Sequence, residues 1–145
     1  MARIQIDLPI QFPFTTELAV YVSHINYGGH LDNVQLLSLV SEAQMRLFAE
    51  LGWPQGRIGD VVTLIADAAV QYRSEAFRGE TMVVRIAAHD FNPKGCDLVW
   101  QMTEESSGRE VARGKTGIVC FDLTTRKLVA IPEGFRQRLE GGPPG

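Results

Sequence analysis

Apolar residues between positions 33 and 51 recur at intervals of three and four, which is the spacing of one face of an α-helix. The stripe has one polar member, Gln44, and consists of Leu36, Leu37, Val40, Ala43, Gln44, Leu47, Phe48 and Leu51. Three more apolar residues lie outside it, namely Val34, Leu39 and Met45. The pattern therefore predicts a long helix that is buried on more than one side.

Local signals mark both ends of this helix. Asp32 or Asn33 can cap its first turn by accepting hydrogen bonds from unpaired backbone N–H groups. Gly52 followed by Pro54 is a normal stop signal. Before the helix, residues 14–23 alternate between apolar and polar positions, and this alternation predicts a first strand.

The rest of the chain reads as strands joined by hairpin turns. Four strand-like segments follow the helix, at 61–76, 80–91, 96–106 and 110–123. A brief strand and a helical turn with Pro132 near its start complete the chain at 127–139. One helix against an antiparallel meander predicts an α+β fold in a single domain, residues 1–140. The Gly- and Pro-rich tail at 141–145 is expected to be disordered.

Composition narrows the class of protein. Charged residues make up 21% of the 145 positions, which is below the usual quarter for a soluble domain. A curled sheet also has exposed edges that a second copy of the chain can cover. Both observations favour a homo-oligomer, either a dimer or a tetramer built from dimers. The net charge is −3, and no Lys/Arg cluster suggests nucleic acid. Cys96 and Cys120 lie in apolar runs without metal-binding spacing, which predicts two buried, reduced thiols. No signal peptide or membrane span is visible, so we expect a cytoplasmic protein.

Polar residues gather at the junction of the first strand and the helix, in the stretch YVSHINYGGHLDN at positions 21–33. This stretch resembles the N-terminal signature of hotdog-fold thioesterases of the 4-hydroxybenzoyl-CoA thioesterase type, Asp-x-Asp-x-x-Gly-His-x-x-Asn, followed by a helix that carries a Glu and ends at Leu-Gly. A second stretch, VQYRSEAFRGETMVV, resembles the family's strand–turn–strand segment, with Tyr72, Gly79 and Glu80 in register. The resemblance extends over residues 12–138.

The resemblance implies a hotdog fold, in which a five- or six-stranded antiparallel sheet wraps one long helix and two subunits join their sheets. It also implies hydrolysis of acyl-CoA thioesters at the dimer interface, without metal or cofactor, coenzyme A being part of the substrate. By the family pattern, the N–H of Asn33 polarises the thioester carbonyl, with Gly29 as a second candidate donor.

The chain departs from the family signature at the carboxylate. Asn26 stands where the second aspartate is expected, and His24 replaces the first. Three hypotheses follow: Asn26 orients water or substrate while Asp32, Glu42 or Asp67 is the base; His24 is the base; or the site binds acyl-CoA and hydrolyses it feebly.

Most candidate residues also have an ordinary structural explanation. Asp32 can be only a helix cap, Glu42 a surface residue, and His24 and His30 structural members of the loop. His30 is otherwise a candidate for direct contact with the substrate. Tyr72, Arg73 and Arg78 are further substrate-binding candidates, the two arginines because coenzyme A carries phosphates.

Two rival functions remain open at this point. A non-catalytic acyl-CoA-binding hotdog module is compatible with Asn26. A hotdog hydratase or dehydratase would use a histidine and a helix carboxylate, which His30 and Glu42 could supply, but the Pro-Gly helix start of that group is absent. The acyl group, and the choice between coenzyme A and acyl carrier protein, are not predicted.

Overall fold

The computed structural model describes residues 2–141 and confirms the predicted α+β order. The elements are β1 (Phe14–Ala19), η1 (Val22–His24), α1 (Asn33–Glu50), η2 (Pro54–Gly56), β2 (Arg57–Ile58), β3 (Val61–Tyr72), β4 (Thr81–Asn92), β5 (Gly95–Glu104), β6 (Glu110–Asp122), β7 (Lys127–Val129) and α2 (Glu133–Gly141). The tail predicted at 141–145 starts within α2, because Gly141 is the last residue of that helix; positions 142–145 lie outside the described residues.

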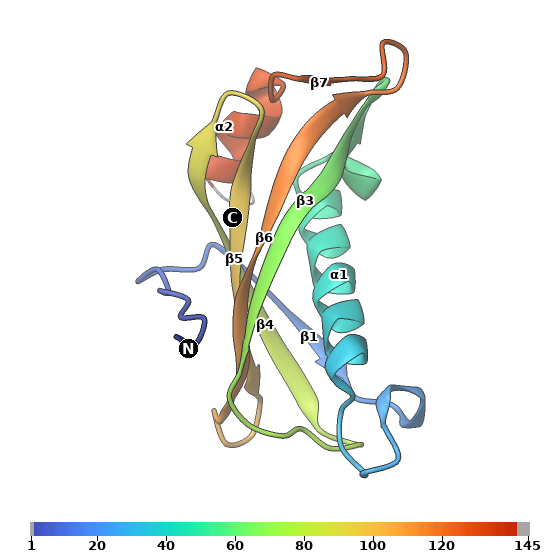
Figure 1. Cartoon of the computed structure of the whole chain (residues 1–145), viewed down its shortest axis with the longest axis vertical. Helices are drawn as coiled ribbons and strands as arrows, with labels where there is room; N and C mark the ends of the chain where they lie inside the picture. The colour runs from blue at the N-terminus through green and yellow to red at the C-terminus, as the bar shows by residue number, and fades with distance from the viewer. Residues whose placement is uncertain (1, 142–145) are drawn as a thin grey trace.

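The strands form one antiparallel sheet in the order β1-β4-β5-β6-β3-β2, and β7 pairs with β6. The helix α1 runs along one face of this curled sheet, and α2 lies at the far end from the start of α1 (Figure 1). The predicted hotdog arrangement is confirmed. Within residues 2–141 the sheet has five longer strands, as expected, and two short ones in addition, β2 and β7, of two and three residues.

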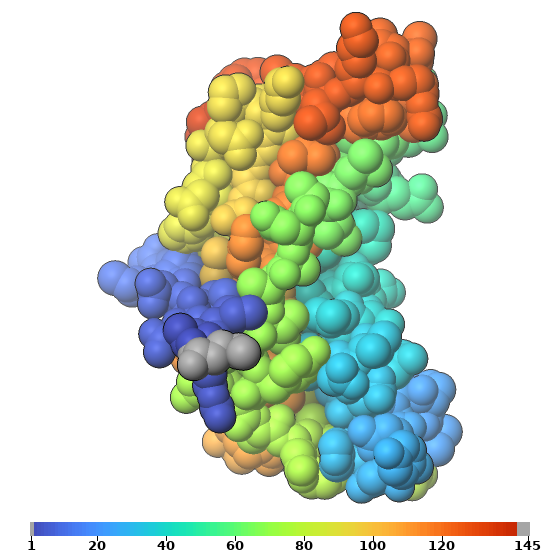
Figure 2. Space-filling view, viewed as in Figure 1, coloured from blue at the N-terminus to red at the C-terminus, as the bar shows by residue number. Residues whose placement is uncertain are grey.

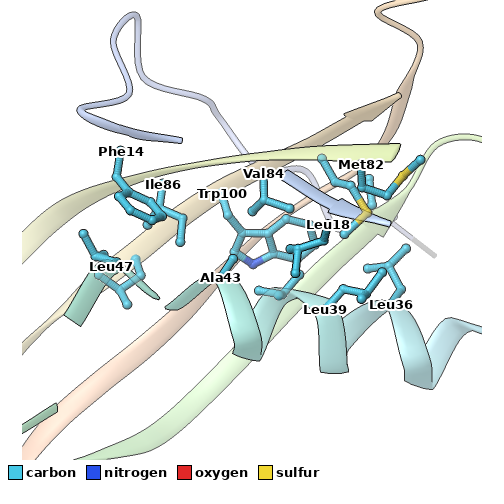
Figure 3. Packing of buried hydrophobic residues seen from close by; sticks show 14 of the residues in the cluster. Phe14, Leu18, Leu36, Leu39, Ala43, Leu47, Met82, Val84, Ile86 and Trp100 are labelled. Atoms are coloured by element: carbon cyan, nitrogen blue, oxygen red, sulfur yellow. The ribbon is translucent and has the colours of Figure 1, made fainter. Parts of the chain in front are cut away.

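The core lies between α1 and the sheet, and Trp100 is its largest fully buried side chain. Figure 3 shows its indole ring among residues of the helix and of the neighbouring strands, including Ala43, Leu39 and Leu18. Gln44, the polar member of the helix stripe, is buried as well, and its Nε2 donates to the hydroxyl of Thr116 at 2.9 Å. This hydrogen bond removes the cost of burying an unpaired amide.

One long edge of the sheet is open in the single chain. Strand β2 pairs with β3 only at Val61 and Val62, so the outer edge of β3 has no strand partner from Thr63 onward among the described residues. Leu64 and Ile65 on this strand are 42% and 62% exposed. An exposed edge that carries large apolar side chains is a typical place for another strand to pair.

The two cysteines are buried and unpaired, as predicted. Burial raises the pKa of the Cys96 thiol to about 12 and that of the Cys120 thiol to about 11, because a buried thiolate loses its hydration. Neither thiol is therefore poised as a nucleophile. Within residues 2–141, no helix combines the length and the apolar character that crossing a membrane requires.

Candidate active site

The loop between β1 and α1 is closed by hydrogen bonds of its own. His24 ends the short helix η1, and its Nδ1 accepts from the backbone N–H of Tyr21 at 2.9 Å. The carbonyl of His24 accepts from the N–H of Asp32 at 2.9 Å, and Ile25 forms an isolated bridge with Leu31. The imidazole of His24 thus helps to hold the loop that leads into the helix.

Asn26 organises the turn that contains the two glycines. Its Oδ1 accepts from the N–H of Gly28 at 2.9 Å, its carbonyl accepts from Gly29 at 3.0 Å, and its own N–H donates to the carbonyl of His30 at 3.0 Å. Gly29 has φ +88°, a conformation that glycine adopts without strain. The N–H of Gly29 is consequently used inside the turn, whereas the side-chain NH₂ of Asn26 has no partner among the described residues.

The first turn of α1 leaves one backbone donor free. Asp32 is the N-cap, and its Oδ2 accepts from Val34 at 2.9 Å and from Gln35 at 3.3 Å. The N–H of Asn33 has no acceptor within residues 2–141. It lies at the positive end of an 18-residue helix, where backbone N–H groups and the helix dipole favour negative charge.

A hollow of about 360 Å³ opens beside this helix end. It is lined by Asn26, His30, Leu31, Asn33, Leu36, Tyr72, Arg73, Ser74, Glu75, Ala76 and Val111. Its two walls are joined by the N–H of Leu31, which donates to the carbonyl of Ala76 at 2.7 Å, and by the hydroxyl of Tyr72, which donates to the carbonyl of Asn33 at 3.2 Å. In Figure 2 the loop before α1, in blue, lies against the yellow-green segment after β3 at the lower end of the molecule.

The structure thus brings five of the predicted site residues into one hollow: Asn26, His30, Asn33, Tyr72 and Arg73. Asp32 caps the helix next to this hollow but does not line it. His24 and Glu42 line a different hollow, together with residues of β1. Asp67 accepts from Lys115 Nζ at 2.8 Å, and Arg78 lines a third hollow, to which Tyr21 also contributes. Neither residue lines the main hollow. Their predicted roles in the site stay predictions.

Sequence reasoning missed one ionisable residue of the hollow, Glu75. Its Oε1 lies 3.8 Å from Nε2 of His30. The residue is part of the VQYRSEAFRGETMVV stretch, but we assigned positions 61–76 to a single strand, whereas β3 ends at Tyr72. The chain then turns toward the loop before α1. No local spacing links the two residues, because their contact depends on how the sheet folds over the helix.

Charges at the rim of the hollow centre on Glu110. Its carboxylate contacts Arg113 Nη2 at 3.0 Å and Arg73 Nε at 3.4 Å, and it accepts from Gln101 Nε2 at 2.6 Å. Partial burial raises the pKa of Glu110, but the hydrogen bonds from Gln101 and Arg113 outweigh that effect, and the pKa lies below its usual value. Glu110 is thus held as an anion that anchors Arg73 at the edge of the hollow.

Comparison with known proteins places this geometry in context. The family model of the thioesterase-like superfamily matches residues 20–139. The long-chain acyl-CoA thioesterase FadM of Escherichia coli (strain K12) is 23% identical over 128 residues, which cover 86% of this chain and 96% of FadM.

Solved structures agree in fold. Slr0204, a 1,4-dihydroxy-2-naphthoyl-CoA thioesterase from Synechocystis, superposes with a TM-score of 0.80 at 21% identity, covering 88% of this chain and 95% of that one. SAV2348 from Staphylococcus aureus, solved in complex with CoA, superposes with a TM-score of 0.78 at 18% identity, covering 97% of this chain and 91% of that one.

Proposed function

Because the chain belongs to the thioesterase-like superfamily, we propose that it is an acyl-CoA thioesterase, which hydrolyses an acyl-CoA to the free acid and coenzyme A. The observation that carries the proposal is the N–H of Asn33, which has no acceptor among the described residues and stands at the positive end of α1, in a residue that lines the hollow. Hydrolysis of a thioester builds negative charge on the carbonyl oxygen, and a fixed donor in this position stabilises that charge.

Asn26 supplies the second polar group of this mechanism. Its side-chain oxygen is occupied by Gly28, so the group that it can offer is its NH₂. The amide therefore orients the substrate, or the attacking water, as a hydrogen-bond donor. Gly29, the other donor expected from the family pattern, already donates to the carbonyl of Asn26, and we leave it out of the mechanism.

The substrate class follows from the relatives and from the rim of the hollow. FadM acts on long-chain acyl-CoA, and SAV2348 binds CoA. In this chain Tyr72 and Arg73 line both the main hollow and a second, wider one of about 820 Å³, which also contains Arg3. A guanidinium at this border suits the phosphates of coenzyme A. The chemistry proposed here needs no metal or cofactor.

The open edge of β3 supports a homodimer, with a homotetramer built from dimers as the larger alternative. Ile65→Lys places a charge on this edge and should convert the oligomer into monomer in sedimentation-velocity experiments. Wild-type protein that is monomeric at micromolar concentration would contradict the proposal. The cytoplasmic location expected from the sequence stays a prediction.

The test of function is release of free thiol from a panel of acyl-CoA esters with short, long and aromatic acyl groups, followed with a thiol reagent. Turnover well above the spontaneous rate supports the esterase. The replacement of the family's aspartate by Asn26 favours one rival, a non-catalytic acyl-CoA-binding module, for which the same panel would show binding without release. Addition of water to an enoyl-CoA would instead indicate a hydratase.

A further inference from the structure

The carboxylates proposed from the sequence are engaged elsewhere in the structure. Asp32 uses Oδ2 to cap two backbone amides of α1. Asp67 forms an ion pair with Lys115 at 2.8 Å, and that lysine also contacts Asp97 at 3.2 Å. Glu42 lines a hollow to which neither Asn26 nor Asn33 contributes. None of the three candidates lines the hollow beside the free N–H of Asn33.

Glu75 is the only carboxylate among the described residues that lines this hollow. Its Oε1 lies 3.8 Å from Nε2 of His30, and its side chain is 62% exposed. That distance is longer than a direct hydrogen bond, and the carboxylate accepts no hydrogen bond within residues 2–141. Unlike Asp32 and Asp67, Glu75 has a carboxylate that is free to accept a proton.

The backbone that carries Glu75 is nevertheless well fixed. Its carbonyl accepts from Arg109 Nη2 at 3.0 Å, and the next carbonyl, of Ala76, accepts from Leu31 at 2.7 Å. Ser74, on the other side, donates its hydroxyl to the carbonyl of Glu110 at 2.7 Å. The position of the backbone is therefore determined, while the exposed carboxylate of Glu75 is held by no hydrogen bond among the described residues.

We propose that Glu75 is the general base of the hydrolysis, with His30 as the residue that positions its carboxylate. This inference rests on the proposed function. The carboxylate of Glu75 removes a proton from water as the water oxygen bonds to the thioester carbon, and the N–H of Asn33 stabilises the resulting oxyanion. The carbon–sulfur bond then breaks, the thiolate of coenzyme A leaves, and Glu75 returns the proton to that sulfur. One water is consumed, and one acid and one thiol are formed.

The arrangement explains why a glycine, Gly28, lies midway between Asn26 and His30. A Cβ at Gly28 would lie 3.2 Å from Oδ1 of Asn26 and 3.3 Å from Nε2 of His30, closer than most real Cβ contacts. Glycine at this position lets both side chains reach the hollow together. His30 faces Glu75 across it, whereas Asn26 and Asn33 stand on the wall formed by the loop and the helix.

The decisive variant is Glu75→Gln, which keeps the shape of the side chain and removes its basicity. A general base contributes about 10²–10⁴-fold, so kcat should fall by that factor while KM and the affinity for free coenzyme A stay within about threefold. The matched control is Glu50→Gln at the other end of α1, which should keep wild-type kcat. For the positioning residue, His30→Gln should lower kcat by roughly tenfold and leave KM unchanged.

A second variant separates a base from a merely structural residue. Glu75→Ala should be as inactive as Glu75→Gln, and added formate, a small carboxylate that can occupy the vacated space, should restore at least about tenfold of kcat. Formate should not raise the rate of the wild type or of Glu75→Gln.

The outcomes distinguish this inference from the function on which it rests. If the wild type releases coenzyme A and Glu75→Gln keeps more than one tenth of its kcat, Glu75 is not the base, and the thioesterase proposal stands. If Glu75→Gln loses its affinity for coenzyme A, the residue serves binding and the inference is also overturned. If the wild type releases no thiol from any ester, both proposals fail.

Discussion

Replacing Asp32 with asparagine and with alanine separates a helix cap from a catalytic base. Oδ2 of Asp32 accepts hydrogen bonds from Val34 and Gln35, and asparagine can repeat both through its side-chain oxygen. Alanine can repeat neither. If the residue is only a cap, stability should depend on the oxygen, and the rate should not depend on the negative charge.

The expected magnitudes follow from these two contacts. Asp32→Ala loses a cap worth about 1 kcal/mol and the attraction between a carboxylate and the helix N-terminus, worth a further ~0.3–1 kcal/mol. For a chain of this length the total corresponds to a fall in Tm of roughly 3–8 °C. Asp32→Asn loses only the second contribution, so its Tm should fall by about 1–4 °C.

The assay pairs thermal unfolding by circular dichroism, at one protein concentration, with kcat for thiol release. We expect Asp32→Asn to keep kcat within about threefold and Asp32→Ala to lose up to about tenfold, because a frayed first turn misplaces the N–H of Asn33. Glu50→Gln removes the same charge from the opposite end of α1 and should leave Tm unchanged or slightly higher. A hundredfold loss of kcat in Asp32→Asn with Tm preserved would refute the cap assignment and move the base from Glu75 to Asp32.

Three further predictions concern stability and the thiols. Hydrogen bonds from Ser106 and Ser107 lower the pKa of Glu104 from 4.5 to about 2, so its contribution to stability is present above pH 4.5 and is lost as pH falls toward 2. The Tm difference between wild type and Glu104→Gln should therefore shrink over that range, and a constant difference would contradict this. Cys96 and Cys120 should resist a thiol reagent at pH 8 in the native protein and react fully in denaturant; rapid native labelling would contradict their burial. Gly114→Ala should cost about 1–3 kcal/mol, because the new Cβ would lie 2.5 Å from the carbonyl oxygen of Ala69 and 2.5 Å from Cζ2 of Trp100. Gly134→Ala, in α2, should not lower the Tm, because its Cβ would only reach ordinary van der Waals contact with Cζ2 of Trp53 at 3.8 Å.

The fold was predictable where its determinants are local. The helix expected at 33–51 is observed at Asn33–Glu50, because the Asp32 cap and the Gly52 stop are both encoded within a few residues of its ends. Strand β2 was missed, since two residues show no periodicity. The strand expected at 61–76 was too long. The backbone of residues 73–76 forms hydrogen bonds with Val111 and Leu31 in place of extending the ladder, and the sequence has no clear stop signal before Arg78-Gly79.

The residues of the site were likewise predictable only where they lie close together in the sequence. Asn26, His30 and Asn33 lie within one short loop and the first residue of the helix, so a motif could find them together. Glu75 enters the hollow only because β3 ends at Tyr72 and the chain then crosses to the loop before α1. Glu42 shows what helical spacing leaves open, and its role in the site stays a prediction. Its position off the main helix stripe was read correctly, but that face of α1 turns toward β1 and its hollow, not toward Asn33.

The replacement of aspartate by Asn26 has a physical explanation in this geometry. Either side chain can accept from the N–H of Gly28, so the turn itself does not require a carboxylate. A carboxylate at position 26 would offer the hollow only acceptor oxygens, on the wall where the thioester oxygen becomes negative in the proposed mechanism. An amide in that place donates toward the charge instead. In the mechanism we propose, the base can stand on the opposite wall, at Glu75, where a carboxylate approaches the water and not the oxyanion. The N–H of Asn33 and the amide NH₂ of Asn26 then donate from the wall formed by the loop and the helix, and Glu75, in the segment after β3, is the acceptor.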